Sequence, residues 1–314
     1  FHWVCVNDAP VRTLRFLLIQ DEIQASYGSA RAVLIRDRNG VTPLMDACVS
    51  GMSTEHVKLL IDSAPESIFV MDNDGWTALH YLCHNARNKY SFAMCVLPLL
   101  LSQSAFENND LAFRQDNSGD NTPLSLACDA FGVTEKSLQD RRQDKIHTAC
   151  DPFFCLQFVT RLLDLVVPPE RKSWPLLSRV FSFNQVPLIF IDMAILSSAK
   201  DALLEVNDDL DTPLHIAVSK PWRSGLVKRV VEACPRTASL RNRRGLLPLQ
   251  IALMTTNENW HQDVCALVDA YPASLEALEL DDSLYSYLLA RIRRHETMFS
   301  IIKSRPTLVQ RRTR

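Results

Sequence analysis

The fold is decided by one stretch of sequence, residues 208–218, which reads Asp-Asp-Leu-Asp-Thr-Pro-Leu-His-Ile-Ala-Val. The pattern predicts a turn that leads into a helix. Thr212 suits the N-cap, where its side chain accepts from free backbone N–H groups of the first helical turn. Pro213 suits the first helical position, where its missing N–H leaves no bond unmade. Leu214 and Ala217 lie three residues apart on one face, and the small Ala217 lets a neighbouring helix approach closely.

The same pattern recurs along the chain. Its copies begin at Thr42, Thr77, Thr122, Thr212 and Leu247, and a degraded copy falls at Trp174. The second copy starts 35 residues after the first, and the last starts 35 residues after the fourth. A period near 35 residues with two helical segments in each unit predicts a solenoid. One such unit cannot bury its own apolar face, so it stacks on its neighbours.

These residues resemble the ankyrin repeat, whose pattern is a turn with Asp and Gly, then Thr-Pro-Leu-His-x-Ala, then a second helix rich in Val and Leu. The unit 37–71 matches best, with Asp37 and Gly40 in its turn. His stands at the motif position only as His80 and His215. The resemblance covers most of the chain, with a gap at about 131–206. It implies an all-α, ankyrin-type α-solenoid of helix-turn-helix repeats with short β-hairpin fingers at the turns.

The repeats divide the chain, which we expect to be a single solenoid, into about six to seven units. The expected units are a truncated first unit at 1–36, repeats at 37–71, 72–115 and 116–167, a degraded unit at 168–206, repeats at 207–241 and 242–278, and a C-terminal cap with a basic tail at 279–314. The charged segment 134–148 is expected to be a surface insertion. Because Leu210 stands where other turns have Gly, we expect its turn to take a different shape.

Net charge and the length of apolar runs give no support to two classes of partner, nucleic acid and membrane. The formal net charge is −2 at pH 7, so no global charge argument favours nucleic acid. The longest apolar run, 186–196, is interrupted by Pro187 and Asp192. It is much shorter than the roughly 18 residues that a membrane-spanning helix needs. We therefore expect no membrane partner.

The nine cysteines are odd in number and lack the spacing of a disulfide scaffold. Three of them, Cys48, Cys83 and Cys128, occupy the same repeat position, where the family uses a small buried Ala. Buried free thiols are typical of a reducing compartment. The sequence therefore predicts a cytoplasmic protein, and the nucleus is the alternative.

Two groups of residues have a spacing that resembles metal ligands. One predicted helix places three of them at i, i+3 and i+4, namely His80, Cys83 and His84. Repeat packing explains the first two better, because they stand at the motif histidine and at the small buried position. A looser set lies around a predicted loop, namely His147, Cys150 and Cys155. The chain has no G-x-G-x-x-G, Walker, G-x-S-x-G or H-E-x-x-H motif. We expect no metal, no cofactor and no catalysis.

The resemblance implies a scaffold that binds another protein through its finger tips and the concave face of its inner helices. Carried over by position, this surface comprises Arg38, Asn39, Val41, Asn73, Asp74, Trp76, His84, Asp208, Asp209, Asp211, Arg243, Arg244 and Leu246. Trp76 is the strongest candidate, because tryptophan is a favoured interface anchor. The alternative for Trp76 is packing against the next finger.

Other readings of the sequence remain open. The segments 220–244 and 291–314 are strongly basic, and this reflects either an ordinary solvated surface or a face that attracts an acidic partner. Nucleic acid is disfavoured, because stacking aromatics do not interleave with the basic residues. The chain begins with Phe1 inside a pattern typical of an inner helix, so we expect a piece of a longer protein. The alternative function is a regulatory or targeting arm of an enzyme whose catalytic domain lies elsewhere. We expect a monomer.

Overall fold

The computed structural model describes residues 1–7, 9–27, 31–102, 111–133, 152–166, 171, 173–183, 186–198, 201–219, 225–254 and 260–275. The chain divides into two compact units. The first contains Phe1–Pro168 with Gln185–Met193, and the second contains Pro169–Asn184 with Ala194–Arg314. The predicted insertion 134–148 and the predicted cap 279–314 lie outside the described residues.

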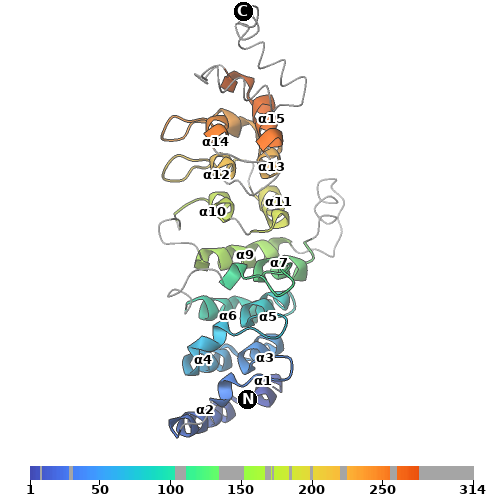
Figure 1. The fold of residues 1–314 in the computed structure, drawn as a ribbon, viewed down its shortest axis with the longest axis vertical. Helices are drawn as coiled ribbons and strands as arrows, with labels where there is room; N and C mark the ends of the chain where they lie inside the picture. The colour runs from blue at the N-terminus through green and yellow to red at the C-terminus, as the bar shows by residue number, and fades with distance from the viewer. Residues whose placement is uncertain are drawn as a thin grey trace, which may run out of the picture. The chain divides into compact units, whose positions relative to one another are not determined.

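The first unit is built of two layers of helices (Figure 1). Each helix packs on the next of its own layer. The inner layer consists of α1 (His2–Val6), α3 (Pro43–Ser50), α5 (Ala78–His84) and α7 (Pro123–Ala130). The outer layer consists of α2 (Val11–Ser26), α4 (Thr54–Ser63), α6 (Tyr90–Ser102) and α9 (Pro152–Val166). Short 3₁₀ turns lead toward the fingers, namely η1 (Ala32–Leu34), η2 (Pro65–Phe69) and η4 (Leu111–Phe113).

The second unit repeats this arrangement. Its inner helices α10 (Leu176–Ser182), α12 (Pro213–Val218) and α14 (Pro248–Met254) pack in chain order, and α13 (Leu226–Ala233) packs on α15 (Trp260–Ala270). The 3₁₀ turns are η6 (Pro235–Ser239) and η7 (Pro272–Leu275). Helix α11 (Leu188–Ser197) contains a boundary between the two units. The predicted all-α repeat fold is confirmed.

The motif leucine is buried in every copy, namely Leu44, Leu79, Leu124, Leu214 and Leu249. On α4 the predicted stripe of Val57, Leu60 and Ile61 is buried as well. Burying one such side chain contributes about 1.5–3 kcal/mol to folding. These leucines and stripes therefore supply the interlayer core.

Prolines end the outer helices at the predicted places. Helices α4, α13 and α15 end two residues before Pro65, Pro235 and Pro272. Each proline then begins a 3₁₀ turn, which the sequence analysis did not predict. Proline fits this position because it lacks the N–H that a continuing helix needs and has a φ suited to a first helical residue.

The predicted β-hairpins are not found, because no described residue is in a strand. Each finger is a turn closed by backbone hydrogen bonds, such as the one from the Asp72 N–H to the Trp76 carbonyl oxygen (2.9 Å). Neighbouring fingers are joined by one such bond. The Asn73 N–H donates to Asn39 (3.0 Å), and the Asn117 N–H donates to Asp74 (2.9 Å). Single bonds of this kind do not build the ladder of a strand pair.

The expectation of a different turn at Leu210 is wrong. Its φ is +56°, in the left-handed region that the equivalent Gly245 also adopts at +76°. The Leu210 N–H donates to the Asn207 carbonyl oxygen (3.0 Å), as the Gly245 N–H does to Asn242 (2.8 Å). The finger keeps its shape, and Leu210 adopts a backbone conformation that costs a residue with a Cβ roughly 1–2 kcal/mol.

The degraded copy at Trp174 is shifted by one position. Its alignment with Thr-Pro-Leu implies that Pro175 is the first helical residue, but Pro175 is the N-cap of α10. In intact copies the residue three positions later accepts a hydrogen bond from the N-cap N–H, as Ser125 does from Thr122 (2.8 Å). Proline has no N–H. The buried Ser178 hydroxyl in this position consequently has no hydrogen-bond partner.

Candidate binding surface

Both ring nitrogens of each motif histidine, His80 and His215, form hydrogen bonds within the repeats. The Nδ1 atom of His80 accepts from the Thr77 N–H (3.1 Å), and its Nε2–H donates to the Arg114 carbonyl oxygen (3.0 Å). His215 accepts from Thr212 (3.1 Å) and contacts the Leu246 carbonyl oxygen (3.2 Å). This tautomer is neutral. Burial, the largest cause, lowers the pKa of His80 from 6.5 to about 4.

The copies without histidine keep the hydrogen bond of the cap. The Gln250 side-chain oxygen accepts from the Leu247 N–H (2.8 Å), and the Met45 sulfur accepts from the Thr42 N–H (3.3 Å). Methionine has no side-chain donor. Met45 therefore cannot make the bond that the His80 imidazole makes to the Arg114 carbonyl oxygen of the next repeat.

The first metal candidate is accounted for by packing. Both ring nitrogens of His80 are bonded, and burial raises the pKa of Cys83 well above its ordinary value. The part of the chain that the structure describes holds no group of three or more His, Cys, Asp or Glu residues placed to bind a metal. Of the second candidate, His147 and Cys150 lie outside the described residues, and Cys155 is buried on α9. None of the described helices is both long and apolar enough to cross a membrane.

Trp76 precedes the inner helix α5 of its own repeat and packs against three aromatic or imidazole rings of that helix. Its ring stacks with His80 at a centroid distance of 6.0 Å and an interplanar angle of 24°. The rings of Tyr81 (5.2 Å) and His84 (5.5 Å) meet it edge-on. We call these four residues the Trp76 platform. Trp76 is half-buried, and its side chain also donates a hydrogen bond to Asp116 of the next finger.

Carboxylates surround the Trp76 platform. The Tyr81 hydroxyl donates to Asp72 (2.6 Å). Burial is the largest cause that raises the pKa of Tyr81, and the charges of Asp72, Asp74 and Asp37 raise it further. Burial also acts to raise the pKa of Asp116, but hydrogen bonds from neighbouring groups outweigh it and hold this pKa well below its usual range. Asp116 is therefore ionised at neutral pH.

The other candidate residues of the first unit form the finger tips. Arg38, Asn39, Asn73 and Asp74 are exposed, and Val41 is half-buried. The Asn73 side chain donates to the Arg38 carbonyl oxygen (3.1 Å). The fingers pack so closely that a Cβ on Gly40 would lie 2.7 Å from the Asn73 side-chain oxygen. Part of Asn73 is therefore used to hold the fingers together.

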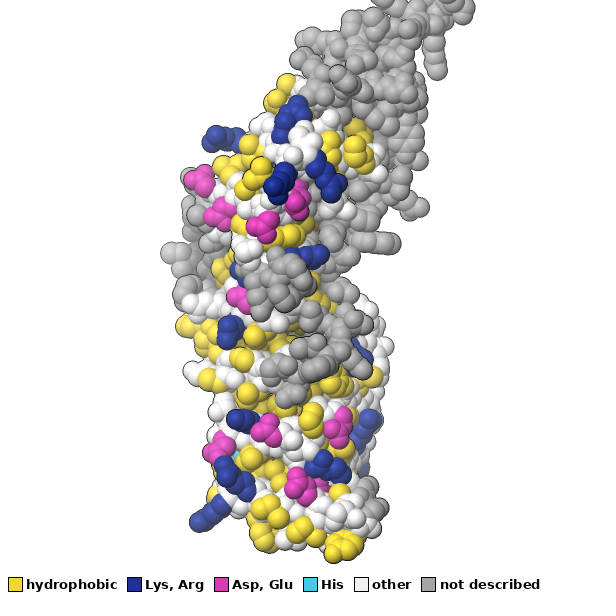
Figure 2. Space-filling model, turned by 90° about the vertical axis from the view of Figure 1, so that its left-hand side faces the viewer, with side chains coloured by type: hydrophobic (Ala, Val, Ile, Leu, Met, Phe, Trp, Pro, Cys, Tyr) yellow, Lys and Arg dark blue, Asp and Glu magenta, His cyan; other side chains and the backbone are white. Residues whose placement is uncertain are grey.

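In the second unit, an acidic finger lies beside a basic one. Asp208 and Asp209 are exposed on the first finger, and Arg243 and Arg244 are exposed on the second. The Arg243 N–H donates to the Asp209 carbonyl oxygen (2.9 Å). Two other candidates are half-buried and already bonded: Asp211 accepts from the Asn242 amide (2.9 Å), and Leu246 accepts from His215. On the face shown in Figure 2, basic and acidic side chains are interspersed.

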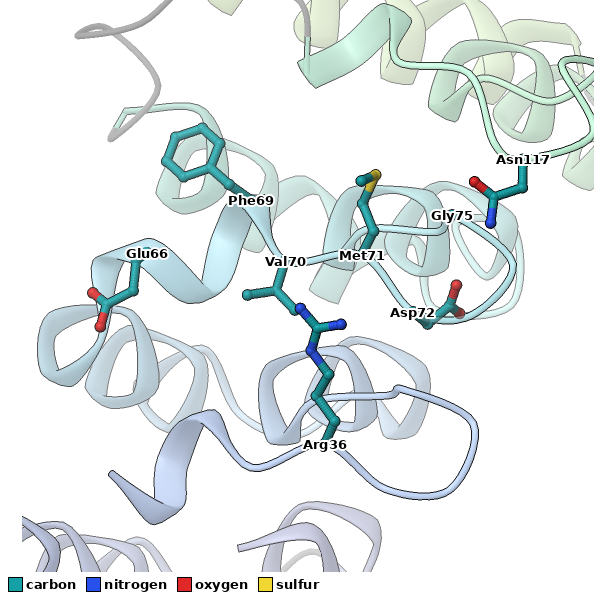
Figure 3. A pocket seen from close by; sticks show the side chains of 8 residues that line it. All are labelled: Arg36, Glu66, Phe69, Val70, Met71, Asp72, Gly75 and Asn117. Carbon is teal, nitrogen blue, oxygen red and sulfur yellow. The ribbon is translucent and has the colours of Figure 1, made fainter. Parts of the chain in front are cut away.

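A groove of about 400 Å³ lies in the first unit (Figure 3). Its lining residues come from three consecutive fingers and from η2 and the segment after it, namely Arg36, Glu66, Phe69, Val70, Met71, Asp72, Gly75 and Asn117. None of the thirteen candidate residues lines it. The Asp72 carboxylate is occupied by Tyr81 and by the N–H groups of Asp74 and Trp76.

Sequence reasoning found Trp76 and His84 but missed Tyr81 and the carboxylates around them. One signal was available. In the first three repeats the residue after the motif histidine position is Trp3, Asp46 or Tyr81, and none of the three is buried. In two later repeats the same position is buried, as Leu126 and Ile216. The position therefore marks the exposed side of the inner helices in the first three repeats only, and there it indicates Tyr81.

The geometry agrees with one comparison between the sequence and known families. A family model of ankyrin repeats, in three copies, matches residues 1–94. Residues 1–94 therefore consist of ankyrin repeats. Ankyrin repeats generally mediate protein–protein interaction. No curated protein matches the chain.

Among solved structures, it is similar to the human ASB11 ankyrin repeat domain, with 18% identity over 86% of this chain and 96% of that chain and a TM-score of 0.31. It is also similar to an ankyrin repeat protein from Leishmania major, with 16% identity, coverage of 98% and 96%, and a TM-score of 0.44. A third similar chain comes from the Bd0816 predatory endopeptidase of Bdellovibrio bacteriovorus in complex with immunity protein Bd3460, with 17% identity, coverage of 82% and 96%, and a TM-score of 0.24.

Proposed function

We propose that this chain is a scaffold that holds a protein partner against its finger tips and the exposed side of its inner helices. The observation that carries the proposal is the Trp76 platform. A half-buried tryptophan, fixed by three neighbouring rings, presents a large rigid area to a partner at little cost in side-chain entropy.

The distribution of partnered and exposed groups supports this proposal. Two groups that could do chemistry are buried inside the repeats, namely His80, whose ring is hydrogen-bonded, and Cys83. A thiol whose pKa is raised forms little thiolate, which is its reactive form. The exposed groups include the finger tips and His84. A protein that binds a partner without catalysis needs only exposed residues of this kind, such as those of the finger tips.

The test is affinity capture with the chain as bait, quantified by mass spectrometry. The Trp76→Ala variant addresses the first unit, and the Arg243→Ala/Arg244→Ala double variant addresses the second. Lys58→Ala is the matched control, because Lys58 is exposed on the outer helix α4. Circular dichroism checks that each variant is folded.

We expect the wild type and Lys58→Ala to retain the same protein, and at least one of the two surface variants to lose it. Equal capture by all four baits would contradict the proposed surface. Loss with Lys58→Ala alone would place the contact on the outer helices instead.

A further inference from the structure

We propose that the Trp76 platform receives a cationic side chain, an arginine or a lysine, that the partner presents. This inference rests on the proposed function and names the chemistry that the first unit recognises. It rests on an aromatic surface and on the negative charge around it. It also rests on a comparison between the two units, which shows that the turns of the fingers do not need this charge.

The aromatic surface offers a cation a tryptophan that is held in place by neighbouring rings and is partly exposed. The Trp76 ring is stacked on His80, and Tyr81 and His84 meet it edge-on. Because Trp76 is only half-buried, part of the indole faces solvent. An indole face carries negative quadrupolar charge and attracts ammonium and guanidinium groups placed over it.

Carboxylates outnumber cations around this surface, where Arg114 is the cation whose charge acts on His80. Four carboxylates act on the rings of the platform: Asp72 accepts from Tyr81, and the charges of Asp37, Asp74 and Asp116 act on Tyr81 or His80. None of the four forms an ion pair with a Lys or Arg side chain of the described residues. The neighbouring cations are bound elsewhere: Lys89 donates to the Val49 and Ser50 carbonyls, and Arg114 donates to the Phe69 carbonyl.

The second unit shows that the turns do not need this charge. In the first unit the Asp37 carboxylate closes its finger by accepting from the Asn39 and Val41 N–H groups (both 2.8 Å). In the second unit Asn207 closes the corresponding finger, accepting from Asp209 (3.0 Å) and Asp211 (2.8 Å).

Two more pairs of fingers extend the comparison. Asp72 accepts from Asp74 (2.9 Å) and Trp76 (2.8 Å), whereas Asn242 accepts from Arg244 (3.1 Å) and Leu246 (3.0 Å) in the same way. A neutral amide oxygen is therefore sufficient for the turn. The charges of Asp37 and Asp72 are a property of the surface, and they occur where the aromatic platform lies.

Arginine fits the site better than lysine. Its planar guanidinium stacks on an indole face, and its N–H groups point outward in the plane, toward carboxylates at the rim. Asp37 and Asp74 are exposed and so remain accessible to such a group. A carboxylate from a partner would be repelled by the same four charges. Exposed charge pairs are screened beyond about 8 Å at physiological salt, so the binding should weaken as salt is raised.

The experiment is a titration followed through the indole N–H resonances of the ¹⁵N-labelled chain. The probe is N-acetyl-arginine amide. N-acetyl-citrulline amide has nearly the same shape without the charge and serves as the probe control. The Trp76→Phe variant assigns the Trp76 resonance. The test variant is Asp37→Asn/Asp72→Asn/Asp74→Asn. In two of its three positions it installs the residue type that closes the second unit's fingers. The matched control is Asp62→Asn, on the exposed side of α4.

We expect arginine to shift the Trp76 resonance saturably, citrulline to have little effect, and the triple variant to weaken arginine binding by about tenfold or more. Asp62→Asn should bind as the wild type does. Equal shifts with citrulline, unchanged binding by the triple variant, or no shift up to the solubility limit of the probe would each overturn the inference. If partner capture still depends on Trp76 in that case, the proposed function stands and this inference alone fails. If arginine binds to the Trp76 platform but neither surface variant loses the partner, the proposed function fails although the platform binds a cation.

Discussion

His80 joins two repeats through the hydrogen bond from its Nε2–H to the Arg114 carbonyl oxygen, 3.0 Å away. In the first repeat His2, which the sequence analysis did not identify as a motif histidine, contacts the Ile35 carbonyl oxygen through its Nε2 atom (2.9 Å). Met45 stands at the motif histidine position of the repeat between those of His2 and His80, and its side chain has no hydrogen-bond donor. Among the bonds of the described residues, none reaches the equivalent Val70 carbonyl. The strength of the connection between neighbouring repeats therefore varies along the first unit.

Replacing His80 by Met should copy the situation at Met45. The variant places an apolar methionine side chain in the buried site. It removes the N–H that donates to the Arg114 carbonyl oxygen. We expect the free energy of unfolding to fall by about 1 kcal/mol, the net contribution of a typical hydrogen bond. Equilibrium urea unfolding measures it, with the exposed His84→Met as control. A loss no greater than that of the control would show that the bond contributes little.

The same histidine predicts how stability depends on pH. The folded pKa of His80 lies at about 4, below its ordinary value of 6.5, and burial lowers the pKa of His215 as well. Between pH 6.5 and about pH 4, His80 binds a proton in the unfolded chain but not in the folded chain. Stability is therefore unaffected by these groups above pH 6.5 and falls as pH drops from 6.5 toward 4. Urea midpoints between pH 7.5 and 5 test this, and His80→Met should show a smaller decrease.

Much of the fold was predictable because its rules are local. The caps at Thr42 and Thr212, the buried motif leucines and the helix ends before Pro65 depend on a few adjacent residues. The finger shape was not predictable in this way. A β-strand requires several backbone hydrogen bonds to a neighbouring segment, whereas neighbouring fingers are joined by one such bond. The shift of Pro175 to the N-cap was hidden because the Pro-Leu pair at 175–176 matches the last two residues of Thr-Pro-Leu.

The candidate surface was predictable in its positions and not in its contacts. The repeat register places Trp76 and His84 outside the core, as the structure has them. Register does not say that the Trp76 side chain also reaches Asp116, since that contact depends on how far the next finger is displaced. Asp211 is the clearest example, because its expected free carboxylate accepts from Asn242 of the next finger.

Leu210→Gly should stabilise the second unit. Leu210 holds a φ of +56° while 49% of its surface is exposed, so the side chain contributes little packing in return. Glycine removes roughly 1–2 kcal/mol of strain and loses about 0.5–1 kcal/mol through its freer unfolded chain. We expect a net gain of about 0.5 kcal/mol in thermal or urea unfolding. Leu210→Ala, which keeps the Cβ and the strain, is the control and should show no gain.

Gly75→Ala and Gly245→Ala separate backbone strain from close packing of the fingers. Both glycines have positive φ, +86° and +76°. A Cβ on Gly75 would lie 2.7 Å from the backbone nitrogen of Asn117, whereas a Cβ on Gly245 meets no atom within 4 Å. Both variants should lose about 1 kcal/mol from strain, and Gly75→Ala should lose about 1–3 kcal/mol more from overpacking. Similar losses for both would mean that the first unit's fingers separate easily.

Ala217→Leu tests whether neighbouring repeats depend on one another. Ala217 is buried on α12, which packs between α10 and α14. Extra methylenes at this tight position should cost about 1–3 kcal/mol. Because the stability of a repeat protein is nearly a sum of units and nearest-neighbour interfaces, the damage should stay local. We expect hydrogen exchange to show lost protection in α10, α12 and α14, with α3 and α5 unchanged. Leu214→Ala, which leaves a cavity in the same helix, should give the same pattern at about 2–5 kcal/mol. A uniform loss of protection from α3 to α14 would show that the chain unfolds as one cooperative block instead.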